Sequence, residues 1–299
     1  MRRDPLMSAG IVYLVLLVLV ATFAPYFRPP YDYPHAGMTF QPPSAQFWLG
    51  TDEQGRDIFA RIAHGARVSL LVGIIVQSIS LVVGITFGVL GVYAPRWISG
   101  PLMRFTDSMF AFPDILLGIL IIGILSPGMF PVIAALSVTA WPSIARLVRT
   151  QVATLKDREF VVASKAMGAS MWWTVTRHVL PQLWGILLAV TMVELAGTIL
   201  AESTLSFLGI GIRPPEPSWG NMIDSGRKLM NSAPMLLLWP CVFLSLTIFA
   251  LNFVGDGIRA AIDPKSRGMA TGELSFMGRL AGLFGRGRPG DGQAQRSGD

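Results

Sequence analysis

Long stretches without a charged side chain limit the folds that this chain can adopt. No Asp, Glu, Lys or Arg occurs from Pro5 to Phe27 or from Val68 to Pro95. Only 14% of the residues are charged and 52% are hydrophobic, whereas a soluble domain carries about a quarter charged residues. A helix of about 20 apolar residues crosses the hydrocarbon core of a bilayer. The sequence therefore predicts an all-α, multi-pass integral membrane protein whose apolar surface lies against lipid.

The first uncharged run, Pro5–Phe27, follows Arg2 and Arg3 and has two readings, a signal peptide or a membrane span. The apolar core of a signal peptide has about 7–15 residues and ends at a small-x-small cleavage site. This run is longer, and Thr22–Pro25 is a poor cleavage site. We expect residues 1–27 to form the N-terminus and an uncleaved first span.

The other runs divide the rest of the chain. Residues 28–67 are polar and rich in proline and aromatic residues, so we expect an extracytoplasmic loop too short for its own core. Residues 68–258 are expected to form a core of five further helices, and residues 259–299 a disordered tail rich in Gly, Arg and Ser. The predicted spans after the first are Val68–Pro95, Met103–Leu125, Val132–Val148, a fifth beginning near Gln182, and Leu229–Gly255.

Small and aromatic residues give two further expectations. Gly84 and Gly88 have the Gly-x-x-x-Gly spacing that lets helix backbones approach closely. Residues 214–217 read Pro-Pro-Glu-Pro and cannot continue a helix, so the chain is expected to leave the membrane there. Trp219 would then lie at the membrane interface, where tryptophan is enriched.

Two aspartates mark the third predicted span. Asp107 and Asp114 are seven residues apart and would share one face of a continuous helix. Arg104 precedes Asp107 by about one turn, which favours a local ion pair near the end of the span. Asp114 follows Pro113 and either starts a helix after a proline kink or is a polar residue of a pathway through the membrane.

The fifth predicted span carries two glutamates and no cation. Glu194 and Glu202 are eight residues apart, within about 80° of each other around a helix. Because acidic side chains in a span normally face a partner or water, we expect both to face a protein interface or a cavity.

A basic segment, Glu159–Pro181, interrupts the apolar sequence, and we call it the connecting segment. Gly168 is expected to divide it into two short helices, and Pro181 to end it before the next apolar run. One reading is a basic cytoplasmic loop that only satisfies the positive-inside rule. The other is a helix–turn–helix element that presents a surface to a soluble partner. The basic residues in and around it are Arg146, Arg149, Lys156, Arg158, Lys165 and Arg177.

The connecting segment resembles the EAA loop of permease subunits in binding-protein-dependent ABC importers. That pattern is Glu-Ala-Ala, three residues, Gly, and about ten residues to Leu-Pro. Gly168 and Leu180-Pro181 match in register, but Val162-Ala163-Ser164 replaces Glu-Ala-Ala, so the role of the family's glutamate is not transferred to Val162. The resemblance implies that a coupling loop over residues 150–181 docks on an ATPase subunit. The residues assigned to it are Glu159, Ala163, Ser164, Gly168, Leu180 and Pro181.

Three other stretches are similar to the dipeptide, oligopeptide and nickel subgroup of these permeases: Leu49–Gly73, Leu200–Gly220 and Asn252–Lys265. Within the first, Thr51-Asp52 looks like a helix cap, and Arg56-Asp57 looks like ordinary surface charge.

The resemblance implies a type I importer fold, with six transmembrane helices and a cytoplasmic helix–turn–helix coupling loop. The chain would be the second, C-type permease of a dipeptide or oligopeptide importer in a prokaryotic cytoplasmic (inner) membrane. Its implied partners are a homologous permease, two ATP-binding subunits and an extracytoplasmic peptide-binding protein. Asp114, Glu194 and Glu202 become candidates for the translocation path or an interface.

The sequence contains no GxxxxGK[ST] phosphate-binding loop, so we expect no ATP hydrolysis by the chain itself and no cofactor. ATP and Mg²⁺ would be bound by the partner ATPases. With six spans and both termini cytoplasmic, thirteen Lys and Arg residues lie on the cytoplasmic side against seven outside, leaving out the four of the distal tail, which agrees with the positive-inside rule.

Other functions are less well supported by the sequence. A nickel or other small-solute importer of the same subgroup stays open. A proton-coupled secondary transporter using the three acidic candidates should show inverted-repeat hydropathy, which we do not find. His35, His64 and His178 are widely spaced and Cys241 is the single cysteine, so no metal site or disulfide is expected. The basic residues flank apolar runs, which does not indicate nucleic-acid binding, and the GxGxxG at Gly285–Gly290 follows no predicted strand.

Overall fold

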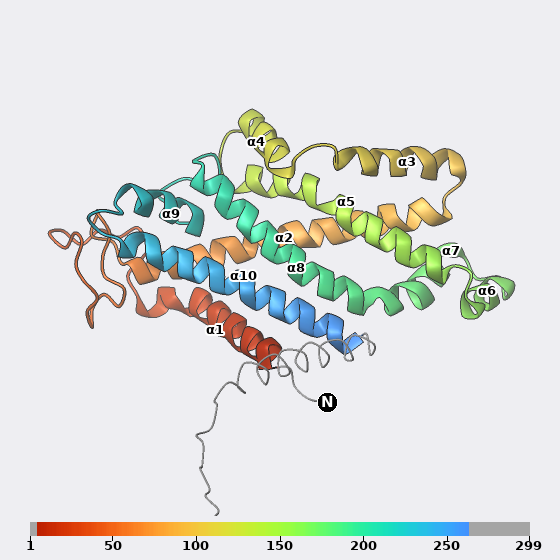
Figure 1. The fold of residues 1–299 in the computed structure, drawn as a ribbon, viewed down its shortest axis with the longest axis horizontal. Coiled ribbons are helices and arrows are strands. Elements are labelled where there is room, and N and C mark those ends of the chain that lie inside the picture. Colours follow the sequence, from red (N-terminus) through yellow and green to blue (C-terminus); the bar gives the residue numbers. More distant parts are fainter. Residues whose placement is uncertain (1–4, 263–299) are drawn as a thin grey trace, which may run out of the picture. The chain divides into compact units, whose positions relative to one another are not determined.

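The computed structural model describes residues 5–262, and within this range the secondary structure is helical, with long loops at residues 28–57 and 208–218 (Figure 1). An isolated antiparallel β-bridge joins Thr51 and Asp57. The helices are α1 (Pro5–Phe27), α2 (Ile58–Tyr93), α3 (Arg96–Met109), α4 (Asp114–Leu125), α5 (Met129–Leu155), α6 (Glu159–Ala166), α7 (Met171–Thr174), the π-helical turn η1 (Val175–Val179), α8 (Leu180–Phe207), α9 (Trp219–Lys228) and α10 (Met235–Ile262).

Five helical stretches in the described range are long and apolar enough to cross a membrane: α1, α2, α5, the run from α7 to α8, and α10. A sixth span requires α3 and α4 together, but the two helices meet at an angle of 92°. The predicted third span, Met103–Leu125, is therefore broken by a sharp bend, and Asp107 and Asp114 do not share one face of a continuous helix. Pro113 explains the break, because proline has no N–H to donate and disfavours a helical conformation of the residue before it.

The long helices run beside one another in Figure 1, with the loop 28–57 and α9 at one end of the bundle and α6 and α7 at the other. Helix α2 packs along α5 and also contacts α1 and α8. At Gly84 and Gly88 the backbones are so close that an added Cβ would lie 2.6 Å from the Cβ of Ile144 or Val148 in α5. The predicted close-packing role of these glycines is confirmed, and α5 is their partner.

The external loop is shorter than predicted, because α2 begins at Ile58 and includes residues up to Arg67. The helix cap is Asp57 and not Thr51-Asp52. Its Oδ1 accepts hydrogen bonds from the backbone N–H groups of Phe59 at 2.8 Å and Ala60 at 3.4 Å. Burial raises the pKa of the Asp57 carboxyl, and these two hydrogen bonds oppose that shift.

Three charged residues of this loop, Asp52, Arg56 and Asp57, are buried, so Arg56 and Asp57 are not the surface charge that the sequence suggested. The Arg56 Nε donates to Asp52 Oδ2 at 2.7 Å, and Arg28 Nη1 lies 3.6 Å from Asp57 Oδ2. The Arg28 guanidinium also lies 3.8 Å from the centroid of the Trp48 ring. Opposite charges and an aromatic face thus compensate for burial and hold the loop against the start of α2.

The second external region differs from the prediction in one residue. Residues 214–217 are non-helical, as predicted, although α8 already ends at Phe207. Trp219, however, is fully buried within the chain, so its ring is not exposed to a membrane interface. Its indole Nε1 donates to the carbonyl of Ile62 at 3.2 Å, and the ring packs with Ala66 and Ile199. A hydrogen-bond partner for the indole N–H makes this burial favourable.

The last predicted span is shifted, because α10 begins at Met235 and continues to Ile262, beyond the expected end at Gly255. It packs on α1, where an added Cβ on Gly10 would lie 2.9 Å from the carbonyl oxygen of Ala250. The predicted disorder of the tail from residue 263 onward and the GxGxxG at Gly285–Gly290 lie outside the described residues.

Candidate functional site

The connecting segment forms two helices joined by a sharp turn at Gly168, whose φ is 84°. This left-handed conformation favours glycine, so the predicted turn is confirmed. The prediction that Pro181 ends the segment is wrong, since the helical path continues from Met171 to Phe207. The N–H of Leu180 bonds to the carbonyl of Val175, five residues back. This π-helical turn carries the helix into Pro181, which has no N–H to donate.

Buried side chains fasten the connecting segment to the ends of the long helices. Val161, Val175 and Val179 are fully buried in a cluster with Val89 of α2 and Val152 of α5.

Between the two short helices, the hydroxyls of Ser164 and Thr174 are 3.0 Å apart and hydrogen-bonded. Ser164 occupies the last position of the Val162-Ala163-Ser164 triplet and is only 1% exposed. The segment is therefore a packed element whose two helices are bonded to each other.

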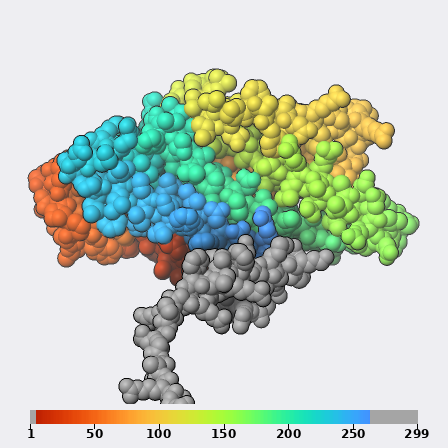
Figure 2. All heavy atoms as spheres, in the orientation of Figure 1, coloured from red at the N-terminus to blue at the C-terminus, as the bar shows by residue number. Residues whose placement is uncertain are grey.

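The connecting segment exposes several large apolar side chains. The exposed fractions are 80% for Met167, 52% for Trp172 and 50% for Trp173. A shallow hollow of about 360 Å³ lies beside the turn, lined by Ser164, Met167, Gly168, Ala169, Ser170 and Trp173. In Figure 2 the green atoms of this region lie at the end of the bundle. Large exposed apolar side chains grouped on one surface mark protein interaction sites.

The six residues that the sequence assigned to the coupling role differ in their exposure to solvent. Glu159 at the start of α6, Ala163 and Gly168 are exposed, and Pro181 is exposed at the start of α8. Ser164 is buried, and Leu180 is half-buried within the helix. Only part of the motif is thus available to a partner, while Ser164 holds the two short helices together.

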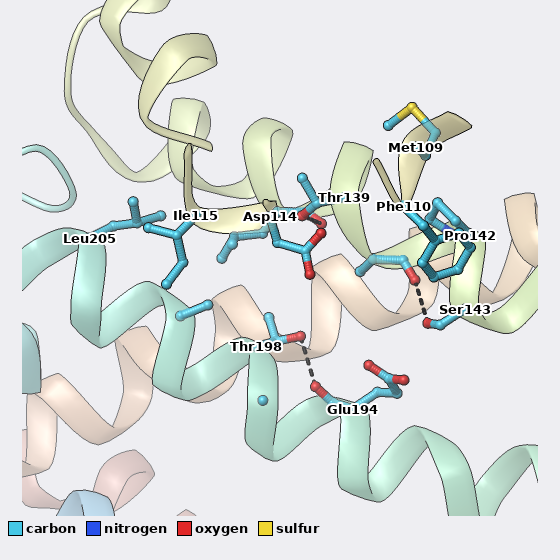
Figure 3. Close-up of a pocket in the computed structure, with 14 residues that line it drawn as sticks. Met109, Phe110, Asp114, Ile115, Thr139, Pro142, Ser143, Glu194, Thr198 and Leu205 are labelled. Carbon is cyan, nitrogen blue, oxygen red and sulfur yellow. Dashed lines mark hydrogen bonds between the residues drawn. The ribbon is translucent and has the colours of Figure 1, made fainter. Parts of the chain in front are cut away.

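A second feature is a pocket of about 280 Å³ between α4, α5 and α8 (Figure 3). Asp114, the first residue of α4, and Glu194 of α8 both line it. Within residues 5–262 neither carboxylate forms an ion pair with a Lys or Arg. Asp114 starts a helix after Pro113, as one of its two readings expected, and it also lines this pocket, while its place in a pathway stays a prediction. The remaining polar lining residues are Thr139, Ser143 and Thr198.

Glu202 does not share this pocket, contrary to the expectation that it faces an interface or cavity. It is fully buried, and its carboxylate accepts hydrogen bonds from Ser69 Oγ of α2 and Ser206 Oγ, each at 2.8 Å, and from Ser203 Oγ at 3.4 Å. Ser206 Oγ in turn accepts from the backbone N–H of Ile212 at 3.0 Å. Serine hydroxyls satisfy this carboxylate, and the spacing Glu-Ser-x-x-Ser was a local signal of such a cluster.

Asp107 also differs from the prediction. Because the chain bends after α3, it does not continue the helical face of Asp114, and its partner is Arg146 of α5 and not Arg104. The Arg146 Nη2 lies 2.9 Å from Asp107 Oδ1. The same guanidinium lies 3.8 Å from the centroid of Phe110. Sequence spacing favours local pairs, and this pair joins residues 39 positions apart.

Family models match most of the chain. Residues 80–268 match the "Binding-protein-dependent transport system inner membrane component" model, and residues 1–43 match the "N-terminal TM domain of oligopeptide transport permease C" model. This chain belongs to the inner membrane component family of binding-protein-dependent transport systems. Membership in this permease family confirms the resemblance inferred from Gly168 and Leu180-Pro181.

Curated relatives of this permease cover nearly its whole length. The oligopeptide transport system permease protein OppC of Bacillus subtilis is 37% identical over 268 residues, 89% of this chain and 88% of the relative. The dipeptide transport system permease protein DppC of the same organism is 38% identical over 270 residues, 89% and 84%. The glutathione transport system permease protein GsiD of Pectobacterium atrosepticum is 37% identical over 268 residues, 89% and 88%.

Among solved structures, an inward-facing MetNI methionine ABC transporter chain superposes with a TM-score of 0.57 at 21% identity, covering 68% of this permease and 96% of that chain. This likeness supports the type I importer fold. The chain is a multi-pass membrane subunit of an ABC importer, and it works with other subunits of such a system.

Proposed function

We propose that the chain is the C-type permease of an ATP-driven importer that passes dipeptides or oligopeptides from an extracytoplasmic binding protein into the cytoplasm. The named relatives are permeases for oligopeptides, dipeptides and glutathione, which are all peptides or peptide-like. These names support a peptide as the solute. The other proposed subunits are a homologous permease and two ATPases.

The observation that carries the proposal is the shape of the connecting segment. A turn at Gly168 exposes Met167 and two tryptophans, while buried valines and the Ser164–Thr174 hydrogen bond hold the segment on α2 and α5. Such a rigid apolar projection suits docking on an ATPase, whose closure would move the segment and reorient the spans in alternating access. The excess of basic residues around the segment supports a cytoplasmic location, with both termini on the same side.

The solute would cross beside the pocket between α4, α5 and α8. Asp114 and Glu194 are acidic groups on membrane helices without an intrachain cation, and such groups normally face a partner or a hydrated path. Glu202 is left out of this path, because it is enclosed by serine hydroxyls.

Uptake by the complete transporter tests the function. The permease, its paired permease, the ATPases and the binding protein are reconstituted in proteoliposomes, and uptake of a radiolabelled dipeptide is compared with uptake of Ni²⁺. ATP-dependent peptide uptake that requires the binding protein is the expected result. Uptake of Ni²⁺ but not of the dipeptide would show that the solute is a metal ion. Uptake driven by a proton gradient without ATP would overturn the assignment as an ATP-driven importer.

A further inference from the structure

The bend between α3 and α4 lies beside the pocket and is built into the sequence. The chain turns by 92° at residues 110–113, and α4 restarts at Asp114. Pro113 cannot donate a backbone hydrogen bond and disfavours a helical Phe112. These few residues therefore form the joint at which the angle between α3 and α4 can change.

One side chain of α5 holds this joint. Arg146 pairs with Asp107, in the last turn of α3, at 2.9 Å. Its guanidinium lies 3.8 Å from the ring centroid of Phe110, the first residue of the joint. We call Asp107, Phe110 and Arg146 the α5 clamp. It fixes the end of α3 and the start of the joint from a single anchor on α5.

The α5 clamp also sets one wall of the pocket. Phe110 and Met109 line the pocket together with Asp114 and Glu194. In Figure 3 the Phe110 ring lies beside Pro142 of α5. A displacement of Phe110 must therefore change the volume that faces the two carboxylates.

Helix α5 links the clamp to the connecting segment. From Arg146 the helix continues for nine residues, about 14 Å, to its end at Leu155. Three residues, 156–158, separate this end from Glu159, the first residue of α6. Pro142 lies one turn before Arg146, on the side away from the connecting segment, and a proline inside a helix is where bending is easiest. Arg146 therefore lies on the same side of Pro142 as the connecting segment.

The charges of the clamp suit a reversible contact. The side chains of Arg146 and Asp107 are 54% and 61% exposed in this chain. On an aqueous surface such a pair is weak. Arg146 and Asp107 can therefore separate and pair again at low cost when α5 moves relative to α3.

We propose that Arg146 is a positioning residue that couples the connecting segment to the pocket, by moving the α3–α4 joint and the Phe110 wall when α5 tilts at Pro142. The inference rests on the proposed function as an importer subunit. It goes further by naming the contact through which motion of the segment reaches the solute path.

Charge exchange across the clamp tests this role in the reconstituted transporter. The variants are Asp107→Asn, Arg146→Gln and the double exchange Asp107→Arg with Arg146→Asp. The readout is the coupling ratio, defined as peptide taken up per ATP hydrolysed. Each single variant is expected to lower this ratio about fivefold, with hydrolysis that depends less on the binding protein. The double exchange is expected to recover most of the ratio, because it restores the ion pair.

A matched control is available on α9, where Asp224 pairs with Arg227 at 3.2 Å and Lys228 at 2.5 Å. The variant Asp224→Asn should leave the coupling ratio unchanged. Wild-type ratios in both single variants, or a double exchange no better than either of them, would overturn the proposal. If the wild-type complex shows no ATP-driven uptake at all, the failure lies with the proposed function, and the clamp is judged by the distance measurement below.

Cross-linking measures the clamp directly. Cysteines replace Asp107 and Arg146 in the full complex, with Cys241, the single natural cysteine, changed to serine. A short bifunctional maleimide should join the two sites with different yields in the nucleotide-free and vanadate-trapped complexes. Equal yields in both states would show that the contact does not move during the cycle and would contradict the proposal.

Discussion

At the scale of single residues, Gly168 and Ser164 have different structural roles in the connecting segment. Gly168 supplies a backbone conformation, and an added Cβ there would meet no atom within 4 Å. Ser164 supplies a buried hydroxyl that bonds to Thr174. Ser164 therefore stabilises the interior of the segment, whereas Gly168 allows the left-handed backbone of the turn.

Replacing Gly168 should uncouple transport without removing the protein from the membrane. A left-handed backbone costs a non-glycine residue about 1–2 kcal/mol, and proline forbids it. Gly168→Val is expected to reduce uptake roughly tenfold, in proportion to the population that keeps the turn, and Gly168→Pro more. ATPase co-purification and peptide uptake at matched expression check this.

Gly100 provides the control for that series. It lies in α3 with no φ in the left-handed region, and an added Cβ there also meets nothing within 4 Å. Gly100→Val should therefore keep uptake within about twofold, since only helix propensity changes. Normal uptake in Gly168→Pro would show that the turn is not the coupling element.

Glu202 should be far more sensitive to substitution than Glu194. Glu202→Ala leaves Ser69 and Ser206 as buried hydroxyls without their acceptor, at about 1–3 kcal/mol each. Glu202→Lys would bury a cation among hydroxyl donors, and we expect little folded protein. Glu202→Gln keeps one acceptor oxygen and should be intermediate, while Glu194→Gln, at the edge of a pocket, should keep normal stability.

Thermal unfolding of the detergent-solubilised variants, at one scan rate, checks this order. The apparent midpoint should fall by roughly 5–10 °C for Glu202→Ala and stay near wild type for Glu194→Gln. Equal midpoints for Glu202→Ala and wild type would mean that the serine cluster is not enclosed as described.

At the scale of elements, hydropathy predicts the long apolar helices but not all of their boundaries. The bounds of α1 match the predicted run, because the absence of charge from Pro5 to Phe27 leaves one way to place it. Helix α2 begins ten residues before its predicted start at Val68. Arg61 and His64 are polar in the sequence, but Arg61 lies beside Asp52 of the loop and His64 beside Glu216. Local charge patterns do not show which distant surface will cover them.

Long-range partners explain the other differences from prediction. The spacing of Arg104 and Asp107 indicated a local pair, but the bend at Pro113 places Asp107 beside Arg146 of α5. The sequence indicated an interfacial Trp219, but its indole N–H donates to the buried carbonyl of Ile62, a partner that local sequence does not show. The pocket joins residues of α4, α5 and α8, so only Asp114 and Glu194 were recognisable as candidates, by their charge in apolar runs.

The contact between α2 and α5 should be the least tolerant of added volume. At Gly88 a new Cβ would lie 2.6 Å from Val148 Cβ and 2.8 Å from the carbonyl oxygen of Ala145. Overpacking of this kind costs about 1–3 kcal/mol. Gly88→Ala should lower the apparent unfolding midpoint by several degrees. Gly123→Ala in α4, where a Cβ meets no atom within 4 Å, should not.

At the scale of the whole molecule, the chain is a membrane subunit without a phosphate-binding loop in its sequence. Purified alone, it should show no ATP hydrolysis above an empty-detergent control. Hydrolysis should appear when the ATPase subunits are co-expressed and should require the connecting segment. Robust hydrolysis by the isolated polypeptide, unaffected by Gly168→Pro, would contradict the permease assignment. The measurement is phosphate release before and after addition of the partner subunits.

The unbroken helical path from Met171 through Pro181 to Phe207 has a thermodynamic consequence. One end of this path carries the exposed Trp172 and Trp173, and the other end holds Glu202 and the serines that fix the loop before α9. If a ligand at one end favours one orientation of this rod, reciprocity requires the same free energy to appear in binding at the other end. In the proposed importer, bound nucleotide should therefore change the affinity for the binding protein by a certain factor, and the bound binding protein should change the affinity for nucleotide by the same factor.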